Sequence, residues 1–187
     1  AKMPSHYPKD ILPEIVICGR SNVGKSSLIN ALTGIRGLAR VSSTPGATRA
    51  VNFFRINKAF YLVDLPGYGY AKTGAHKRGE WAEMVERYIG GRPCLVGAIV
   101  LIDARRGMEE EEEALFEWLN NLGLNIAVVF TKADKLKRHE LSICLKEIKT
   151  QVHCSAAVAV SSKTGLGVDA LIKEIRQALL KPAAHPS

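Results

Sequence analysis

The chain has 187 residues, of which 47% are hydrophobic, and its 26 Lys and Arg against 18 Asp and Glu give a net charge of +8. This length suits one domain with a sizeable core, and no apolar run approaches the roughly 20 residues that span a bilayer. The four cysteines lack metal-ligand spacing and the first residues contain no apolar run, so we expect a cytoplasmic protein without membrane contact.

Apolar runs and helical spacing predict strands that alternate with helices along the chain. We expect strands at 14–18, 51–57, 60–64, 98–103, 125–130 and 156–160, and helices at 25–33, 80–89, 108–122, 138–150 and 168–180. The segments 34–48 and 67–79 are predicted loops because they are polar and rich in glycine. Short apolar strands between helices indicate a three-layer α/β fold, in which helices cover both faces of a mostly parallel sheet.

The whole pattern predicts one domain over residues 13–181. An extension (1–12) precedes it and a flexible tail (182–187) follows it. Ligands of mostly parallel sheets bind at the carboxyl ends of the strands. The motifs that carry chemistry in this chain all follow such ends.

The first motif, G-R-S-N-V-G-K-S at residues 19–26, fits the phosphate-loop pattern G-x-x-x-x-G-K-[ST] at every fixed position. Glycines let the backbone wrap a phosphate closely, Lys25 reaches the β- and γ-phosphates, and the Ser26 hydroxyl ligates Mg²⁺. The apolar strand before the loop and the helix after it are the order that such a site needs. The alternative is a glycine-rich surface turn.

The second motif is Asp64-Leu65-Pro66-Gly67, at the end of the predicted strand 60–64. A carboxylate placed there holds Mg²⁺, usually through water, so Asp64 is a predicted metal residue. The Gly67 N–H can approach a γ-phosphate because no Cβ stands in the way.

The third motif, Thr131-Lys132-Ala133-Asp134, follows the strand 125–130. Guanine presents two adjacent donors, N1–H and N2–H₂, which one carboxylate accepts together, so Asp134 favours guanine over adenine. The Lys132 stem lies over the base plane in this interpretation. The alternative for Asp134 is a helix N-cap.

The fourth motif, Ser161-Ser162-Lys163, follows the last strand. The Ser162 backbone N–H is placed to donate to guanine O6. This triplet is informative only because of its position after the final strand.

Together the motifs G-R-S-N-V-G-K-S, T-P-G-A-T, D-L-P-G, T-K-A-D and S-S-K resemble those of a translation-factor-class small GTPase. The longer stretches 19–30, 52–54 (N-F-F) and 64–71 (D-L-P-G-Y-G-Y-A) resemble the EngB (YihA/YsxC) family of ribosome-biogenesis GTPases. The resemblance covers residues 13–180. It implies a P-loop NTPase fold whose six-stranded sheet has one antiparallel edge strand, GTP or GDP with Mg²⁺ as ligands, and the bacterial cytoplasm.

It also implies a monomer that acts in late assembly of the large ribosomal subunit, on ribosomal RNA rather than DNA, with a link to cell division and septation. The resemblance extends the nucleotide site to a larger set of residues: Gly19, Arg20, Ser21, Asn22, Val23, Gly24, Lys25, Ser26, Ser27, Gly46, Ala47, Thr48, Asp64, Leu65, Pro66, Gly67, Thr131, Lys132, Ala133, Asp134, Ser161, Ser162 and Lys163.

Thr48 matches the switch threonine of the family, which meets Mg²⁺ and the γ-phosphate in the GTP state. Thr44 competes for this role, but the spacing P-x-x-T favours Thr48. With Thr48, Lys25, Gly67 and Asn22 are the expected catalytic residues. Asn22 resembles the asparagine of potassium-stimulated GTPases, where a K⁺ ion acts like an arginine finger. The alternative is that Asn22 only shapes the loop.

Two residues differ from the common GTPase pattern. Thr131 stands where most GTPases have asparagine, which predicts weaker bracing of the phosphate loop. Tyr68 follows Gly67, where GTPases that position water themselves often carry glutamine, so we expect slow hydrolysis without a partner. Tyr68 and Tyr70 either stack on RNA bases or pack over their own helix, and packing is favoured.

The basic excess lies wholly in residues 1–108, which contain 16 Lys and Arg against 7 Asp and Glu. The predicted loops share it, through Arg36, Arg40, Arg49, Lys72, Lys77 and Arg78. This distribution favours an RNA partner gripped by nucleotide-ordered loops, and an ordinary solvated surface is the alternative. The run 109–113 of five glutamates is interpreted as helix-dipole stabilisation. A signalling switch that acts on a protein and a small-molecule kinase remain as alternative functions.

Overall fold

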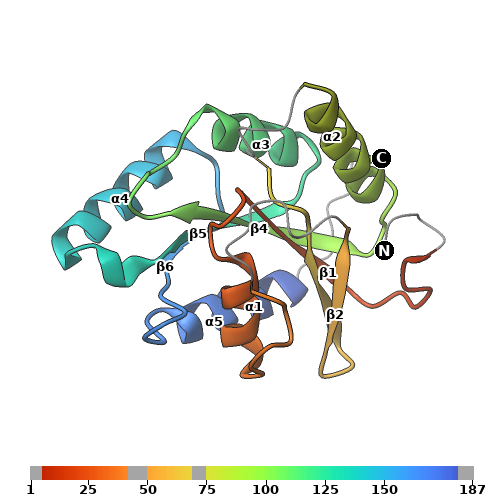
Figure 1. Ribbon diagram of the computed structural model, residues 1–187, viewed down its shortest axis with the longest axis horizontal. Coiled ribbons are helices and arrows are strands. Elements are labelled where there is room, and N and C mark those ends of the chain that lie inside the picture. The colour runs from red at the N-terminus through yellow and green to blue at the C-terminus, as the bar shows by residue number, and fades with distance from the viewer. Residues whose placement is uncertain (1–5, 42–49, 69–74, 181–187) are drawn as a thin grey trace.

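The computed structural model describes residues 6–41, 50–68 and 75–180. Its secondary structure alternates strands and helices as the sequence predicts (Figure 1). The elements are β1 (Glu14–Gly19), α1 (Lys25–Thr33), β2 (Asn52–Ile56), β3 (Phe60–Asp64), α2 (Ala75–Gly90), β4 (Leu95–Asp103), α3 (Glu110–Asn121), β5 (Asn125–Thr131), a 3₁₀ turn (Ala133–Lys135), α4 (Arg138–Gln151), β6 (Ala156–Ala159) and α5 (Val168–Leu180).

The strands form one six-stranded sheet in the order β2-β3-β1-β4-β5-β6. All neighbours run parallel except β2 and β3, so the antiparallel edge strand is confirmed. A tight hairpin joins β2 and β3 because Asn57 and Lys58 both adopt positive φ, 48° and 57°. Two such residues give the turn whose twist matches that of paired strands.

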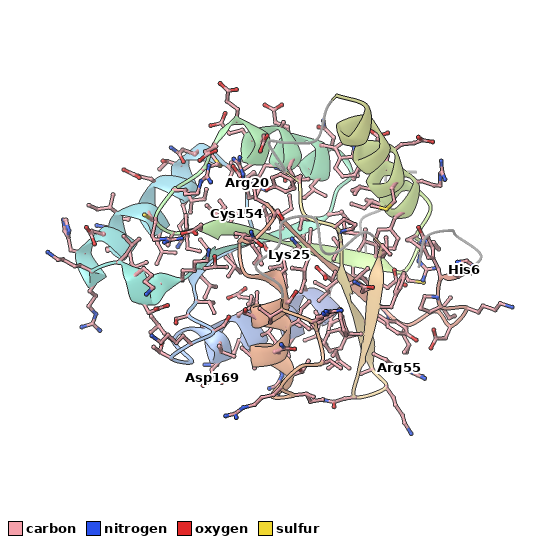
Figure 2. The ribbon with its side chains drawn as sticks, in the orientation of Figure 1. His6, Arg20, Lys25, Arg55, Cys154 and Asp169 are labelled. Carbon is pink, nitrogen blue, oxygen red and sulfur yellow. The ribbon has the colours of Figure 1, made fainter. Side chains whose placement is uncertain are left out.

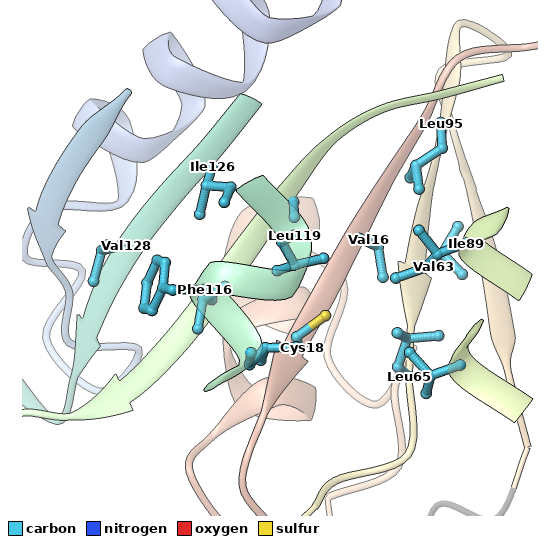
Figure 3. Close-up of a cluster of buried hydrophobic side chains, with 14 of the residues drawn as sticks. Val16, Cys18, Val63, Leu65, Ile89, Leu95, Phe116, Leu119, Ile126 and Val128 are labelled. Atoms are coloured by element: carbon cyan, nitrogen blue, oxygen red, sulfur yellow. The ribbon is translucent and has the colours of Figure 1, made fainter. Parts of the chain in front are cut away.

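Helices α2, α3 and α4 cover one face of the sheet, and α1 and α5 cover the other (Figure 1). The alternation of side chains along β1 explains how one strand serves both layers. Val16 and Cys18 pack with Leu119 of α3 (Figure 3), while Ile15 and Ile17 pack in the other layer with the α1 and α5 residues. Each fully buried aliphatic side chain contributes about 1.5–3 kcal/mol to folding.

Two element boundaries differ from the sequence prediction by three residues or more. Helix α2 begins at Ala75, so the prediction of a loop through Gly79 is wrong for its last five residues. Gly79 is exposed with open space around it, and one such glycine inside a helix costs only about 1 kcal/mol. Strand β4 begins at Leu95 rather than Ala98, because Gly97 lets the backbone approach the Asn125 carbonyl of β5 closely.

At the edge of the sheet where the strands begin, a buried carboxylate connects three segments of the chain. Glu14 of β1 has no exposed surface and accepts hydrogen bonds from the Tyr88 hydroxyl (2.7 Å) and from Arg92 Nε (3.0 Å). The Arg92 guanidinium also lies over the Tyr7 ring, 5.7 Å from its centroid. These contacts fix the segment around Tyr7 and the end of α2 at the edge of the sheet opposite the motifs. Within the described part of the chain, no helix combines the length and apolar character needed to cross a membrane.

Candidate functional site

The motifs meet at one edge of the sheet. Because β1, β3, β4, β5 and β6 run parallel, their carboxyl ends lie side by side. The residues that these ends place together are Gly19 of β1, Asp64 of β3, Asp103 of β4, Thr131 of β5 and Ser161 after β6.

The phosphate loop has a backbone that only its own residues accommodate. A Cβ on Gly19 would lie 2.9 Å from Val23 Cγ1 and 3.0 Å from the Leu101 carbonyl of β4. Gly24 has φ 115° at the position that starts α1, and Asn22 has φ 63°. Glycine adopts such conformations without strain, and asparagine is among the few other residues that tolerate them. The conformation of the loop before α1 therefore depends on Gly19, Asn22 and Gly24.

Lys25 turns back from the start of α1 into this loop (Figure 2). Its ammonium donates to the carbonyls of Gly19 (3.1 Å) and Arg20 (3.3 Å), and 8% of the residue is exposed. Burial lowers the pKa of Lys25, and the nearby Asp64 carboxylate opposes that shift. The side chain is thus held at the loop where the sequence predicts phosphate binding.

Asp64 ends β3 with 2% of the residue exposed. Burial raises its pKa to about 6, against the opposing effects of Lys25 and of a hydrogen bond with Asn52. Among the described residues, its Oδ1 has no hydrogen-bond partner. A buried carboxylate oxygen without a partner is costly unless a cation or water meets it. Asp64, with the half-buried Ser26 beside Lys25, therefore fits the predicted Mg²⁺ site.

The D-L-P-G segment lies directly against the phosphate loop. The Ser21 N–H donates to the Tyr68 carbonyl at 2.9 Å, and a Cβ on Gly67 would lie 2.8 Å from Ser21 N. Leu65 and Pro66 are buried behind this contact. Glycine at 67 is thus required by close approach to the phosphate loop, while its approach to a γ-phosphate stays a prediction.

Thr131 braces the phosphate loop, and the expectation that it does so more weakly than asparagine stays a prediction. Its buried hydroxyl lies 2.7 Å from the Val23 carbonyl, to which it donates. The next residue, Lys132, adopts φ 57° and its ammonium donates to the Asn22 carbonyl at 2.9 Å. The shorter threonine side chain meets the loop because β5 ends within hydrogen-bond reach of it. Two consecutive residues of the third motif therefore hold the first.

Asp134 is exposed and oriented by a partner. The Ser161 hydroxyl donates to Asp134 Oδ1 at 2.7 Å, and this bond lowers the pKa of Asp134. Asp134 lies inside the 3₁₀ turn, while Lys137 is the N-cap of α4, so the N-cap alternative is wrong. Ser161 thus positions the carboxylate, whereas Ser162 and Lys163 are exposed in the following loop.

Two parts of the site belong to no sequence motif. They are Asp103 and the glutamates that pair with Arg20. Asp103 accepts hydrogen bonds from Lys132 Nζ (2.8 Å) and from Arg105. Burial opposes ionisation, but these donors keep the pKa of Asp103 well below its usual value. Arg20 of the phosphate loop forms ion pairs with Glu109 and Glu111, beside the start of α3 (Figure 2). Their signal in the sequence is only an aspartate at a strand end and a glutamate run.

Several predicted residues lie outside the described ones. They are Thr44, Gly46, Ala47, Thr48, Arg49, Tyr70 and Lys72. Tyr68 is described and packs against the core, with its hydroxyl donating to Glu112 at 3.1 Å. The packing interpretation is therefore the one that the structure supports for Tyr68.

Comparison with known proteins agrees with this geometry. Residues 14–132 match the family described as "50S ribosome-binding GTPase". The chain is 43% identical over 174 residues to a "Probable GTP-binding protein EngB" of Alkaliphilus metalliredigens, covering 91% of this chain and 84% of that protein.

Two solved structures share the fold. One is the crystal structure of a probable GTP-binding protein engB (TM-score 0.73, 23% identity), with 89% of this chain and 98% of that chain covered. The other is Era in complex with MgGDPNP and nucleotides 1506–1542 of 16S ribosomal RNA (TM-score 0.73, 23% identity), with 94% and 59% covered.

Proposed function

The chain belongs to the 50S ribosome-binding GTPase family, among the proteins named EngB, and from this premise we propose that it is a GTP-gated assembly factor for the large ribosomal subunit. The observation that carries the nucleotide part is the joined set of Thr131, Lys132 and Asp134. Thr131 and Lys132 brace the phosphate loop. Asp134 follows them directly, and its carboxylate, oriented by Ser161, is the proposed acceptor for the base. This family assignment removes the small-molecule kinase alternative.

The residues divide the work of phosphoryl transfer among them. Lys25 holds the β- and γ-phosphates, and the Gly67 N–H donates to the γ-phosphate. Ser26 and Asp64 would hold Mg²⁺, with Thr48 as the further predicted ligand. Bound Mg²⁺ would neutralise part of the negative charge of the phosphates. Asp134 selects guanine, and Ser162 donates to its O6.

Hydrolysis by the isolated protein is slow in this proposal. Tyr68 stands where a water-orienting amide would act, and a phenol hydroxyl cannot orient water as an amide does. We expect turnover on the order of 10⁻³ per second or below without a partner. A rate near 1 per second would contradict the assignment.

Asn22 is the proposed K⁺ residue. The backbone carbonyl of Asn22 accepts a hydrogen bond from the Lys132 ammonium. The Asn22 backbone therefore shapes the loop whether or not its side chain binds K⁺. Turnover in equimolar KCl and NaCl separates the two roles. Equal rates would leave Asn22 with the structural role alone.

The gated output is proposed to be RNA contact. Arg36 and Arg40 are exposed in the segment after α1, within the basic half of the chain. Era, which shares this fold over 59% of its own length, was solved in complex with a 16S ribosomal RNA fragment. Arginines of this kind bind phosphates, so the affinity should fall steeply with salt. The proposal places the protein in the cytoplasm as a monomer, and extends to its role in cell division and septation.

Co-sedimentation with large-subunit particles tests the gating. We expect tighter binding with a GTP analogue than with GDP, and weaker binding after Arg36→Ala and Arg40→Ala. Arg176→Ala removes the same charge from an exposed position on α5 and is the matched control. Equal affinity in both nucleotide states would overturn the gating. Absence of particle binding would favour the alternative, a signalling switch that acts on a protein.

A further inference from the structure

The glutamate run at the start of α3 contains one residue unlike the others. Glu112 is 2% exposed, whereas Glu110, Glu111 and Glu113 are exposed. Helix-dipole stabilisation explains carboxylates on the surface of a first turn. It does not explain why one of them is buried, because burial of a carboxylate requires specific partners.

The partners of Glu112 come from two directions. Its Oε1 accepts the Tyr68 hydroxyl at 3.1 Å, and its Oε2 accepts the Glu109 N–H at 3.1 Å. Both carboxylate oxygens therefore act as acceptors. The first bond joins α3 to the residue directly after the D-L-P-G segment, 44 positions earlier in the chain.

Tyr68 is held at its backbone as well. Its carbonyl accepts the Ser21 N–H at 2.9 Å, and Arg20 and Tyr68 form a β-bridge. Arg20 also forms ion pairs with Glu109 and Glu111 of the same glutamate run. The start of α3 is thereby fixed to the phosphate loop, and it holds the tyrosine from that fixed position.

This arrangement leaves little distance between Gly67 and Lys25. A Cβ on Gly67 would lie 2.9 Å from Lys25 Nζ and 2.8 Å from Ser21 N. The Lys25 ammonium is the end of a flexible side chain, but Ser21 meets Gly67 with its backbone, so Gly67 is packed on the phosphate loop with no room for a further carbon atom. Both donors that a γ-phosphate would need, the Lys25 ammonium and the Gly67 N–H, lie at this contact, where Lys25 already donates to the Gly19 and Arg20 carbonyls.

We propose that Glu112 is a positioning residue that holds the D-L-P-G segment against the phosphate loop through Tyr68, and so biases the protein toward GDP. A ligand shifts a two-state equilibrium only by its differential affinity for the two states. The Glu112–Tyr68 bond supplies such a difference, because it stabilises the arrangement in which Gly67 is packed on Ser21 and Lys25 is bonded to loop carbonyls, contacts that a γ-phosphate held by Lys25 and Gly67 would replace. The inference rests on nucleotide binding and is independent of any contact with ribosomal particles.

The test compares the affinity for GDP with that for a non-hydrolysable GTP analogue, using fluorescent nucleotides and no ribosomal particles. Tyr68→Phe removes only the hydroxyl and keeps the ring in the core. A hydrogen bond to a charged group has a strength that corresponds to about a tenfold effect. We therefore expect the preference for GDP over the analogue to fall by about tenfold.

Glu112→Gln should lower the same preference, and the effect of Tyr68→Phe should largely disappear in a Glu112→Ala background. Glu113→Gln makes the same charge change at an exposed neighbour and should leave the preference within twofold of the wild type. A preference unchanged by Tyr68→Phe would overturn the proposal, and so would a full effect of that change in the absence of Glu112. Loss of affinity for both nucleotides alike would point to a merely structural role and would also overturn it.

Discussion

Thr131→Val tests whether a threonine braces the phosphate loop of this GTPase. Valine keeps the shape of threonine but removes the hydroxyl that donates to the Val23 carbonyl at 2.7 Å. The bond is buried, since Thr131 and Val23 are both buried residues, so the carbonyl loses a partner without gaining water. An unsatisfied buried group of this kind costs about 1–3 kcal/mol.

Part of that cost falls on nucleotide binding, because the loop must be ordered before it wraps a phosphate. We expect GDP affinity to fall by about tenfold, which corresponds to about 1.4 kcal/mol. Titration of fluorescent GDP gives the affinity, and urea unfolding reports the share lost in stability. Thr131→Ser keeps the hydroxyl and is the matched control, expected within about threefold of the wild type. If valine and serine variants bind GDP equally well, the bracing role is refuted.

Two further predictions concern buried carboxylates. Burial raises the pKa of Asp64 from 3.8 to about 6, so the folded protein holds this proton more tightly than the unfolded chain. The stability that protonated Asp64 contributes is therefore fully present below about pH 4 and is lost as pH rises through 6, by up to about 3 kcal/mol. Urea unfolding at several pH values should show that Asp64→Asn lacks this loss. Equal pH dependence of the two proteins would contradict the raised pKa of Asp64. Tyr88→Phe removes the hydroxyl that donates to Glu14 at 2.7 Å, in a site without water access, so we expect about 1–3 kcal/mol lower stability with unchanged GDP affinity. An unchanged urea midpoint for Tyr88→Phe would show that Arg92 alone satisfies Glu14.

The sheet and the motif positions were predictable because they depend on local patterns. Apolar strands and helical spacing define the layers, and parallel strands bring their carboxyl ends to one edge regardless of detailed packing. Gly67 and Lys25 could be assigned roles for that reason. The start of α2 was missed because Gly79 resembles a helix end in sequence, while the helix tolerates it.

The positioning residues were not predictable in the same way. Asp103 reaches Lys132 because the register of β4 and β5 pairs Asp103 with Thr131. The Arg20–Glu109 pair joins residues 89 positions apart, and no spacing rule connects them. Such contacts depend on how helices and strands pack, so they become visible only in three dimensions.

The central claim is that the Asp134 carboxylate recognises guanine. Asp134→Asn replaces one acceptor by an amide donor, while the amide oxygen can still accept from Ser161 and keep the side chain oriented. Titration with GDP and xanthosine diphosphate should show the wild type preferring GDP and the variant preferring the xanthine nucleotide, with GDP affinity reduced about a hundredfold. Asp169→Asn, at an exposed position on α5, should retain the wild-type preference. An Asp134→Asn variant that still prefers GDP would contradict the account.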